Sequence, residues 1–213
     1  MATSSRTIEP AADATRRGAK TRRRILTAAT RQFSERGYDG AKFREIGDVA
    51  DVSFQSIRYH FGTKEKLWEA VVEQLHDDAE AAMLDNEREL AELPPAEQLR
   101  AQIRAMVAYQ AEHPELQKIL LREAMKGSER YRQAFNQHVR RFERNAVRFL
   151  GGLQDAGVIK PDIELQDLFY VFRGALNYRL VAPPSGDTRG SSRKIRDEVI
   201  ERHAETITRL LMA

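Results

Sequence analysis

Apolar residues recur three and four positions apart along most of this 213-residue chain, and the alternation typical of strands is nearly absent. Glycine and proline are sparse and stand mainly between the periodic segments. The pattern therefore predicts an all-α protein. Helices are expected at residues 21–36, 43–50, 54–60, 65–92, 95–113, 115–126, 129–150, 163–180 and 193–212.

The first of two short helices in the N-terminal third, predicted at residues 43–50, carries one apolar face. We expect the following side chains to form that face and to be buried: Phe43, Ile46, Val49 and Ala50. Asp51 follows directly. Because Asp tolerates the left-handed backbone conformation with which helices often stop, this residue is expected to end the helix.

The second short helix, predicted at residues 54–60, begins after Ser53, a favourable N-cap. Its Ile57 stands four positions before Phe61, so both face the same side. Two short helices joined by a tight turn predict a helix-turn-helix at about residues 42–61. The preceding helix, which Gly37 ends, is expected to pack across both and complete a three-helix core.

The outer face of the second short helix presents polar side chains that suit nucleic acid. Gln55, Ser56, Arg58 and Tyr59 are of types that contact base edges and phosphates in a major groove. Charge supports this interpretation, because residues 1–68 carry 14 Lys and Arg against 8 Asp and Glu, while the remainder carries 21 against 24. DNA binding is therefore the leading hypothesis.

The run from Arg23 to Trp68 resembles the DNA-binding domain of the TetR family of transcriptional regulators. Three pieces carry the resemblance: ILTAATRQFSERGYDG, FREIGDVADVS and YHFGTKEKL. It implies base contacts from the start of the second short helix and backbone phosphate contacts from Thr63 and Lys64. The predicted DNA-binding residues are Arg44, Ser53, Phe54, Gln55, Ser56, Arg58, Tyr59, His60, Thr63 and Lys64.

Three regions are expected along the chain. Residues 1–18 are predicted to be a disordered basic arm, followed by a DNA-binding domain at 19–68. Residues 69–213 are predicted to form a larger helical ligand-binding and dimerisation bundle. The resemblance implies that the helices at 163–180 and 193–212 pair with their copies in a homodimer, which would place two DNA-reading heads on a palindromic operator.

The resemblance also implies control by a small molecule that binds among the core side chains of the bundle. The larger candidates mix methionine, aromatic and histidine side chains, which favours an apolar or aromatic effector. The predicted ligand-binding residues are Trp68, Met106, Tyr109, Met125, Phe135, His138, Phe142, Phe172 and Tyr178.

Other functional classes find little support. The chain has no cysteine, its five histidines lack a repeated metal-ligand spacing, and phosphate-binding glycine loops are missing. We therefore expect no catalysis, metal or cofactor, no membrane association, and a cytoplasmic, nucleoid-associated location. The main hypothesis is a repressor released from its operator by an effector. Two alternatives remain open: an accessory or architectural DNA-binding protein without an effector, and a helical-bundle enzyme or carrier.

Overall fold

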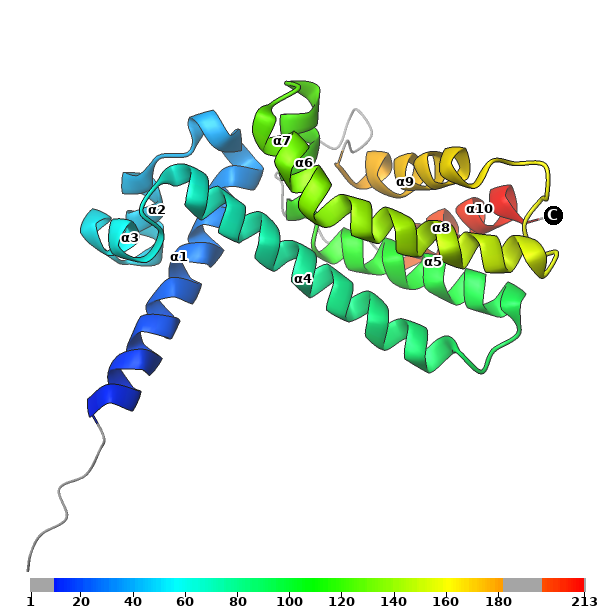
Figure 1. Cartoon of the computed structure of the whole chain (residues 1–213), viewed down its shortest axis with the longest axis horizontal. Helices are drawn as coiled ribbons and strands as arrows, with labels where there is room; N and C mark the ends of the chain where they lie inside the picture. The colour runs from blue at the N-terminus through cyan, green and yellow to red at the C-terminus, as the bar shows by residue number, and fades with distance from the viewer. Residues whose placement is uncertain (1–9, 182–196, 213) are drawn as a thin grey trace, which may run out of the picture. The chain divides into compact units, whose positions relative to one another are not determined.

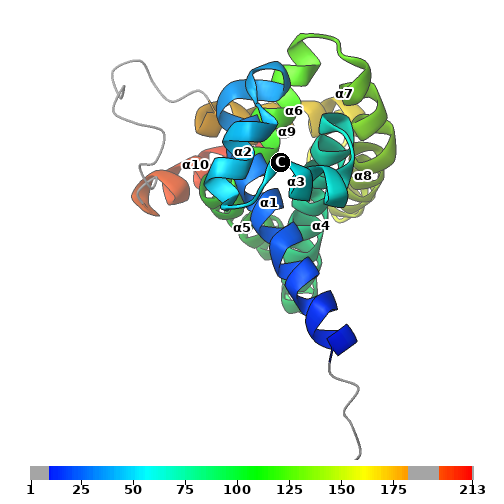
Figure 2. The same ribbon diagram turned by 90° about the vertical axis from the view of Figure 1, so that its left-hand side faces the viewer.

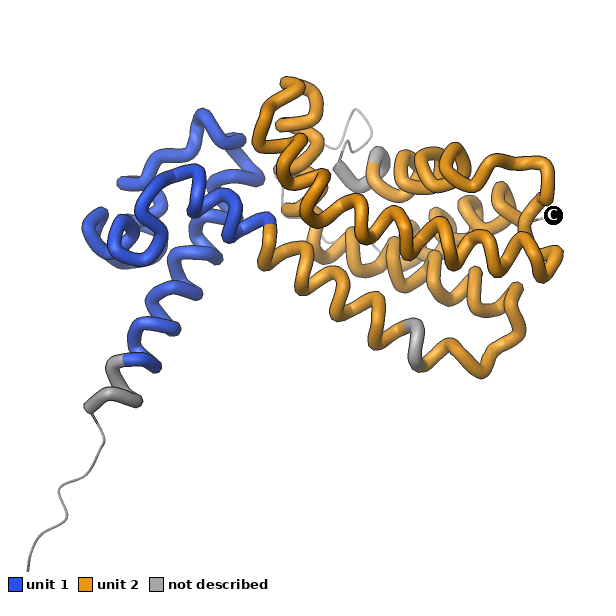
Figure 3. The backbone as a smooth tube through the Cα atoms, in the orientation of Figure 1, with its two compact units in different colours: residues 1–72 blue, residues 73–213 orange. Residues whose placement is uncertain are grey.

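The computed structural model describes residues 10–181 and 197–212, and the backbone over these ranges is almost entirely helical. The described residues form no strand, only an isolated antiparallel bridge between Ile159 and Met212. The predicted all-α class is therefore confirmed. The chain divides into two compact units, residues 1–72 and 73–213 (Figure 3). This division falls inside a long helix, four residues beyond the predicted boundary at 68.

The first unit consists of three helices and the start of a fourth: α1 (Pro10–Gly40), α2 (Phe43–Ala50), α3 (Phe54–Phe61) and the first turns of α4 (Lys64–Leu90). Figure 1 and Figure 2 both show α2 and α3 against the C-terminal half of α1. The three helices meet in a small apolar core. Its buried members include Ile25, Ala29, Phe33, Ile46, Ala50, Ile57, Phe61 and Leu67.

Helix α1 begins earlier than predicted. It starts at Pro10, so the predicted disordered arm is wrong for residues 10–18. Proline is well suited to the first helical position, and the alanines that follow are the strongest helix formers. Residues 1–9 lie outside the described residues. At the other end, Gly37 has φ 72°, so it interrupts the helical geometry where the stop was predicted.

The turn between α2 and α3 uses the two residues that the sequence indicated. Asp51 has φ 51° and ψ 55°, the left-handed conformation, and its carboxylate and carbonyl both accept hydrogen bonds from Arg24 of α1, at 2.8 and 3.0 Å. The Ser53 hydroxyl accepts a hydrogen bond from the backbone N–H of Ser56 at 3.1 Å. The helix-turn-helix is therefore held by a left-handed stop, an N-cap and a contact to α1.

One expected core residue of α2 is not buried. Val49 is 51% exposed, whereas Ile46 and Ala50 are buried. These two lie four positions apart and share one side of the helix, while Val49 lies about 60–100° further round. Because α2 is only eight residues long, its buried side is narrower than the four-residue face that the sequence predicted.

The second unit contains the rest of α4 and a bundle of further helices. The predicted helix at 129–150 extends to residue 155 and contains one π-helical turn, labelled η1. The elements that follow α4 are α5 (Pro95–Glu112), α6 (Glu115–Met125), α7 (Glu129–Ala134), η1 (Phe135–Val139), α8 (Arg140–Asp155), α9 (Leu165–Val181) and α10 (Asp197–Leu211).

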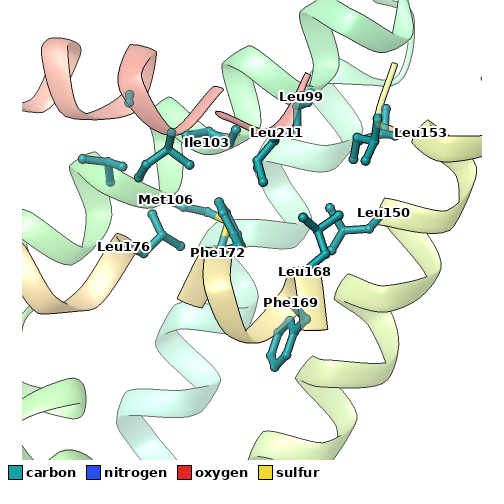
Figure 4. Packing of buried hydrophobic residues seen from close by; sticks show 14 residues of the cluster. Leu99, Ile103, Met106, Leu150, Leu153, Leu168, Phe169, Phe172, Leu176 and Leu211 are labelled. Atoms are coloured by element: carbon teal, nitrogen blue, oxygen red, sulfur yellow. The ribbon is translucent and has the colours of Figure 1, made fainter. Parts of the chain in front are cut away.

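The core of the second unit forms where α5 packs against α8, α9 and α10. Figure 4 shows Met106 and Phe172 close together, with Leu176 beside them. Members of this core come from all four helices: Leu99, Ile103, Met106, Leu150, Leu153, Leu168, Phe169, Phe172, Leu176 and Leu211. At the surface, ion pairs join α5 to α10, at 3.2 Å between Arg100 and Glu205 and 2.5 Å between Arg104 and Glu201. The apolar side chains of the four helices thus form one continuous core.

The left-handed turn at Asp51 predicts a specific order of stability. Asp51→Ala is expected to lower the free energy of unfolding by about 1–2 kcal/mol, because alanine is strained at positive φ and cannot contact Arg24. Asp51→Gly should stay within about 1 kcal/mol of wild type, since glycine relieves that strain. Urea unfolding followed by circular dichroism measures both. An Asp51→Ala protein as stable as wild type would contradict this account of the turn.

Candidate functional site

The outward face of α3 is exposed while its inward face is buried. Ile57 and Phe61 point into the core of the first unit. On the opposite side, Tyr59 is 86% exposed, and Gln55 and Arg58 are also exposed. The helix is thus anchored by its apolar side and presents polar and aromatic groups to solvent.

Two cations of this surface form no ion pair with any of the described residues. The Arg58 guanidinium lies 5.9 Å from the centre of the half-exposed Phe54 ring, and no carboxylate among the described residues pairs with it. Arg44 on α2 is exposed and likewise forms no ion pair within the described part of the chain. Both charges therefore remain available to an anionic partner such as a phosphate backbone.

Several of the predicted DNA-binding residues support the backbone instead of presenting a free group. The Ser53 hydroxyl caps α3, and the Thr63 hydroxyl caps α4 by accepting a hydrogen bond from the Lys66 N–H at 3.2 Å. Ser56 donates its N–H to the first cap and is half-buried. His60 is half-buried and packs edge-on against the Tyr59 ring, with 5.3 Å between the ring centres.

Lys64 lies at the start of α4 and is tied to the end of α1. Its ammonium nitrogen lies 4.7 Å from the centre of the Tyr38 ring and 3.4 Å from the carbonyl oxygen of Asp39. A cation over an aromatic face is attracted by the ring quadrupole. Lys64 therefore fixes the loop after α1 as well as contributing positive charge near α3.

The second unit contains a partly open cavity of about 70 Å³. Helices α4, α5, α6, α8 and α9 and the π turn η1 contribute to its wall. Four of the predicted ligand-binding residues line it: Met106, Tyr109, Phe142 and Phe172. A larger hollow of about 400 Å³ shares part of this wall, through Met83, Met106, Phe142 and Phe172. Ligand binding at these residues stays a prediction.

Other predicted ligand-binding residues lie elsewhere. Met125 is 88% exposed because it is the last residue of α6, just before the turn at Gly127, so its expected burial is wrong. Phe135 is half-buried against Tyr131 and lines neither hollow, and Trp68 is buried within the first unit. The side chain of Tyr178 lies outside the described residues.

The cavity also contains polar side chains that the sequence analysis did not select. His76, Arg173 and Asn177 all line it. His138, which was predicted, stacks on His76 with 5.2 Å between ring centres and 16° between ring planes. The sequence holds only a weak signal for Arg173, which is the one charged residue between Leu168 and Leu176 of α9.

Burial, together with the smaller effects of the neighbouring His138 and Arg173, lowers the pKa of His76 from 6.5 to about 4. The ring is therefore neutral at pH 7. Its Nε2 atom is buried and has no hydrogen-bond partner. A neutral imidazole with one unused nitrogen at a cavity wall is a ready donor or acceptor for a bound molecule.

Metal and membrane sites find no support in the part of the chain that is described. No cluster of histidine, aspartate and glutamate there is arranged to hold a metal ion. Over the same residues, none of the helices has the combination of length and apolar character that crossing a bilayer requires.

A helix-turn-helix with exposed cations on its outer face, in a chain whose second unit contains a cavity, fits a DNA-binding transcriptional regulator. Family models agree: "Bacterial regulatory proteins, tetR family" matches residues 25–71, and "Tetracyclin repressor-like, C-terminal domain" matches residues 92–179. The chain belongs to the TetR family of bacterial transcriptional regulators.

Named relatives support the same conclusion. The HTH-type transcriptional repressor NicS of Pseudomonas putida is 31% identical over 154 residues, which cover 72% of this chain and 66% of NicS, just under two thirds of its length. The HTH-type transcriptional repressor SCO4008 of Streptomyces coelicolor is 29% identical over 168 residues, covering 76% of this chain and 80% of the relative. The family and these relatives are regulators and not enzymes.

Solved structures confirm the fold. The ketosteroid transcriptional regulator KstR2 of Mycobacterium tuberculosis matches with a TM-score of 0.68 at 18% identity, covering 90% of this chain and 95% of that one. A structure of AibR in complex with isovaleryl coenzyme A and operator DNA matches with a TM-score of 0.69 at 21% identity, covering 90% and 97%.

The lowered pKa of His76 predicts a loss of stability in acid. The unfolded chain binds a proton near pH 6.5 and the folded chain only near pH 4, so stability is complete above pH 6.5 and falls as the pH drops toward 4. By pH 5 this group is expected to cost about 2 kcal/mol. Urea unfolding at pH 7.5 and pH 5.0 should therefore show a smaller loss for His76→Gln than for wild type. Equal losses would contradict the assignment.

Proposed function

We propose that this protein represses transcription as a homodimer that binds a palindromic operator through α3 of each copy and leaves it when a small molecule binds the second unit. The observation that carries the proposal is the outer face of α3, where Arg58, Gln55 and Tyr59 are exposed around a buried apolar side. An eight-residue helix is about 12 Å long, which fits a major groove about 12 Å wide.

The side chains of this surface divide into two roles. Arg58 and Gln55 carry the donors and acceptors that distinguish base edges, and Phe54 offers an apolar contact for a thymine methyl group. Arg44, Tyr59, His60 and Lys64 suit phosphate and sugar contacts, which position the protein without reading sequence. Ser53 and Thr63 act through the backbone, because Ser53 caps the reading helix α3 and Thr63 caps α4, the helix that follows it.

Dimerisation is supported by apolar side chains that the bundle leaves uncovered. Val171 is 66% exposed, and Tyr170 beside it on α9 is exposed as well. Gly174 follows on the same side of α9, where an added Cβ would meet no atom within 4 Å. Leu210 of α10 is 69% exposed. Exposed apolar groups on the last two helices fit an interface with a second copy.

Control by an effector is supported by the cavity and its larger neighbour. An effector shifts the protein between a DNA-binding and a released state only by its difference in affinity for the two. The mostly apolar walls, with Met106, Phe142 and Phe172 shared by both hollows, fit a ligand with an apolar body. As a regulator of this kind, the protein would act in the cytoplasm on chromosomal DNA.

Two arginine variants separate reading from positioning. Arg58→Ala is expected to relax specificity at one base pair, with a loss of about 1–3 kcal/mol on the operator and little change on unrelated DNA. Arg44→Ala should weaken binding to all duplexes similarly and lower the salt dependence by about one phosphate contact. Fluorescence anisotropy over a range of salt concentrations measures both effects.

Arg140→Ala is the matched control for these variants, because Arg140 is an exposed arginine of the second unit without an ion pair among the described residues. It should bind operator DNA as wild type does. If Arg58→Ala and Arg44→Ala also bound as tightly as wild type, the reading face would have been assigned to the wrong surface.

The proposed dimer interface is tested by placing a charge in it. Val171→Glu should weaken the dimer by at least about 100-fold, because burying an unpaired carboxylate costs several kcal/mol. Met125→Glu is the matched control, since Met125 is an apolar residue on α6 that is 88% exposed, against 66% for Val171. Light scattering after size-exclusion chromatography measures the mass of each. A Val171→Glu protein that remains dimeric at all accessible concentrations would rule out this face.

A further inference from the structure

Arg173 is a cation in the wall of the cavity that has no ion-pair partner among the described residues. It lies on α9 between the buried residues Phe172 and Leu176, and it lines the cavity with them. Among the described residues, no carboxylate forms an ion pair with it. Glu143 of α8 is near enough for its charge to favour the guanidinium, but burial dominates and lowers the pKa of Arg173 below its usual value. Partial burial therefore makes the charged form of Arg173 less favourable here than it is in water.

Two more polar groups at the same wall lack partners. The Nε2 atom of His76 and the Oδ1 atom of Asn177 are buried without a hydrogen bond. The amide nitrogen of Asn177 donates to the carbonyl oxygen of Arg173 at 2.7 Å, which fixes the orientation of the amide and leaves Oδ1 as the unused acceptor. Since buried polar groups are nearly always satisfied, this grouping indicates a missing polar partner.

The His138 ring packs against the His76 ring beside this wall. His138 lies on the π turn η1, and its ring stacks against that of His76. The neighbouring Val139 lines the cavity. A π turn shifts the register of the side chains that follow it, and such turns occur frequently at functional sites. The stacking restrains His76, while its Nε2 atom stays unused.

The cavity that holds Arg173, His76 and Asn177 shares part of its wall with a larger, mostly apolar hollow. The adjoining hollow of about 400 Å³ shares Met83, Met106, Phe142 and Phe172 with the cavity. A molecule with one polar end and an apolar body would place its polar end at Arg173 and its body among these side chains. Arg148 also lines the larger hollow, but it is exposed, so water competes for its charge.

We propose that this site binds a monocarboxylate with an apolar body, whose carboxylate pairs with Arg173 and accepts a hydrogen bond from His76. The assignment deepens the proposed function, on which it rests, by naming the chemical class of the effector. A single formal positive charge suits a monoanion, and the planar guanidinium matches a carboxylate in two parallel hydrogen bonds. The unused Oδ1 of Asn177 fits a hydroxyl or N–H donor elsewhere on the same molecule.

The test compares the affinity of the DNA-free protein for an acid with its affinity for the alcohol that has the same hydrocarbon part. Isothermal titration calorimetry is carried out with octanoate against 1-octanol, and with 3-phenylpropanoate against 3-phenyl-1-propanol. At least one acid should bind wild type about 10–100-fold more tightly than its alcohol, the value expected for a charged hydrogen bond in a shielded site. Acids and alcohols that bind equally, or acids that do not bind, would overturn the proposal.

Arg173→Met should remove the preference for the acid while retaining the alcohol, since methionine keeps the apolar part of the side chain. Without ligand, this variant should melt no lower than wild type, because it removes a half-buried charge that forms no ion pair among the described residues. A lower melting temperature would identify Arg173 as a structural residue and count against the site. His76→Gln, a second variant, should weaken acid binding and leave alcohol binding unchanged.

Arg148→Met is the matched control and should keep the acid preference. If the preference vanished in Arg148→Met and survived in Arg173→Met, the carboxylate would lie in the outer hollow and the assignment would be wrong. Octyl phosphate serves as the dianionic comparison. If the protein bound octyl phosphate more tightly than octanoate, the assignment of a monocarboxylate would be overturned. Failure of the proposed function is distinguishable, because DNA binding by unliganded wild type is measured separately and does not involve Arg173.

Discussion

The position of α3 depends on the burial of one side of an eight-residue helix. Helices this short are unstable alone in water, so the burial of Ile57 and Phe61 against the other helices of the first unit supplies what local propensity does not. The cap at Ser53 and the left-handed turn at Asp51 then fix where the helix begins. Because the inward side is fixed, the outward side is fixed with it, and this is why Arg58 and Gln55 form an exposed polar surface, the one that we propose reads DNA.

The second unit is organised by a different constraint, an apolar bundle that contains a positive charge. Burial of Leu99, Ile103 and Phe169 stabilises the packing of α5 and α9. His76 and Arg173 oppose that tendency: the buried Nε2 atom of His76 has no hydrogen-bond partner among the described residues, and partial burial lowers the pKa of Arg173. Polar groups without partners destabilise a core, but they can bind a ligand. Their position in the cavity wall therefore indicates where a ligand would bind. In the proposed regulator, the first unit reads DNA and the second unit binds the effector.

Helix positions could be predicted closely where a local signal marks them. Asp51 and Ser53 defined the turn of the helix-turn-helix, and the proline and glycine residues between the later helices marked most of their ends. Signals that depend on three-dimensional packing were missed. Val49 shares a helical face with Ile46 in projection, yet α2 buries only a narrow side. The π turn at Phe135–Val139 leaves no mark in the spacing of apolar residues.

The candidate site residues also divide into those that a local sequence signal marks and those that depend on three-dimensional packing. Spacing and residue type were enough to select the exposed face of α3, because a short helix with a known buried side leaves one outer face. Pocket residues were chosen by size and apolar character, which cannot tell Met125 at a helix end from Met106 in the wall of the cavity. Residue size also gave no weight to Arg173 or Asn177, whose importance lies in their missing partners. Those absences become visible only when neighbours are known.

The most direct test of the central claim is selection of bound duplexes from a random DNA pool by the full-length protein. Two copies of α3 in a symmetric dimer predict an enriched inverted repeat whose half-sites are centred about 10 base pairs, or a multiple of that, apart. A pool without an enriched sequence, or one enriched for a single unrepeated half-site, would contradict the account of a dimeric, sequence-reading regulator.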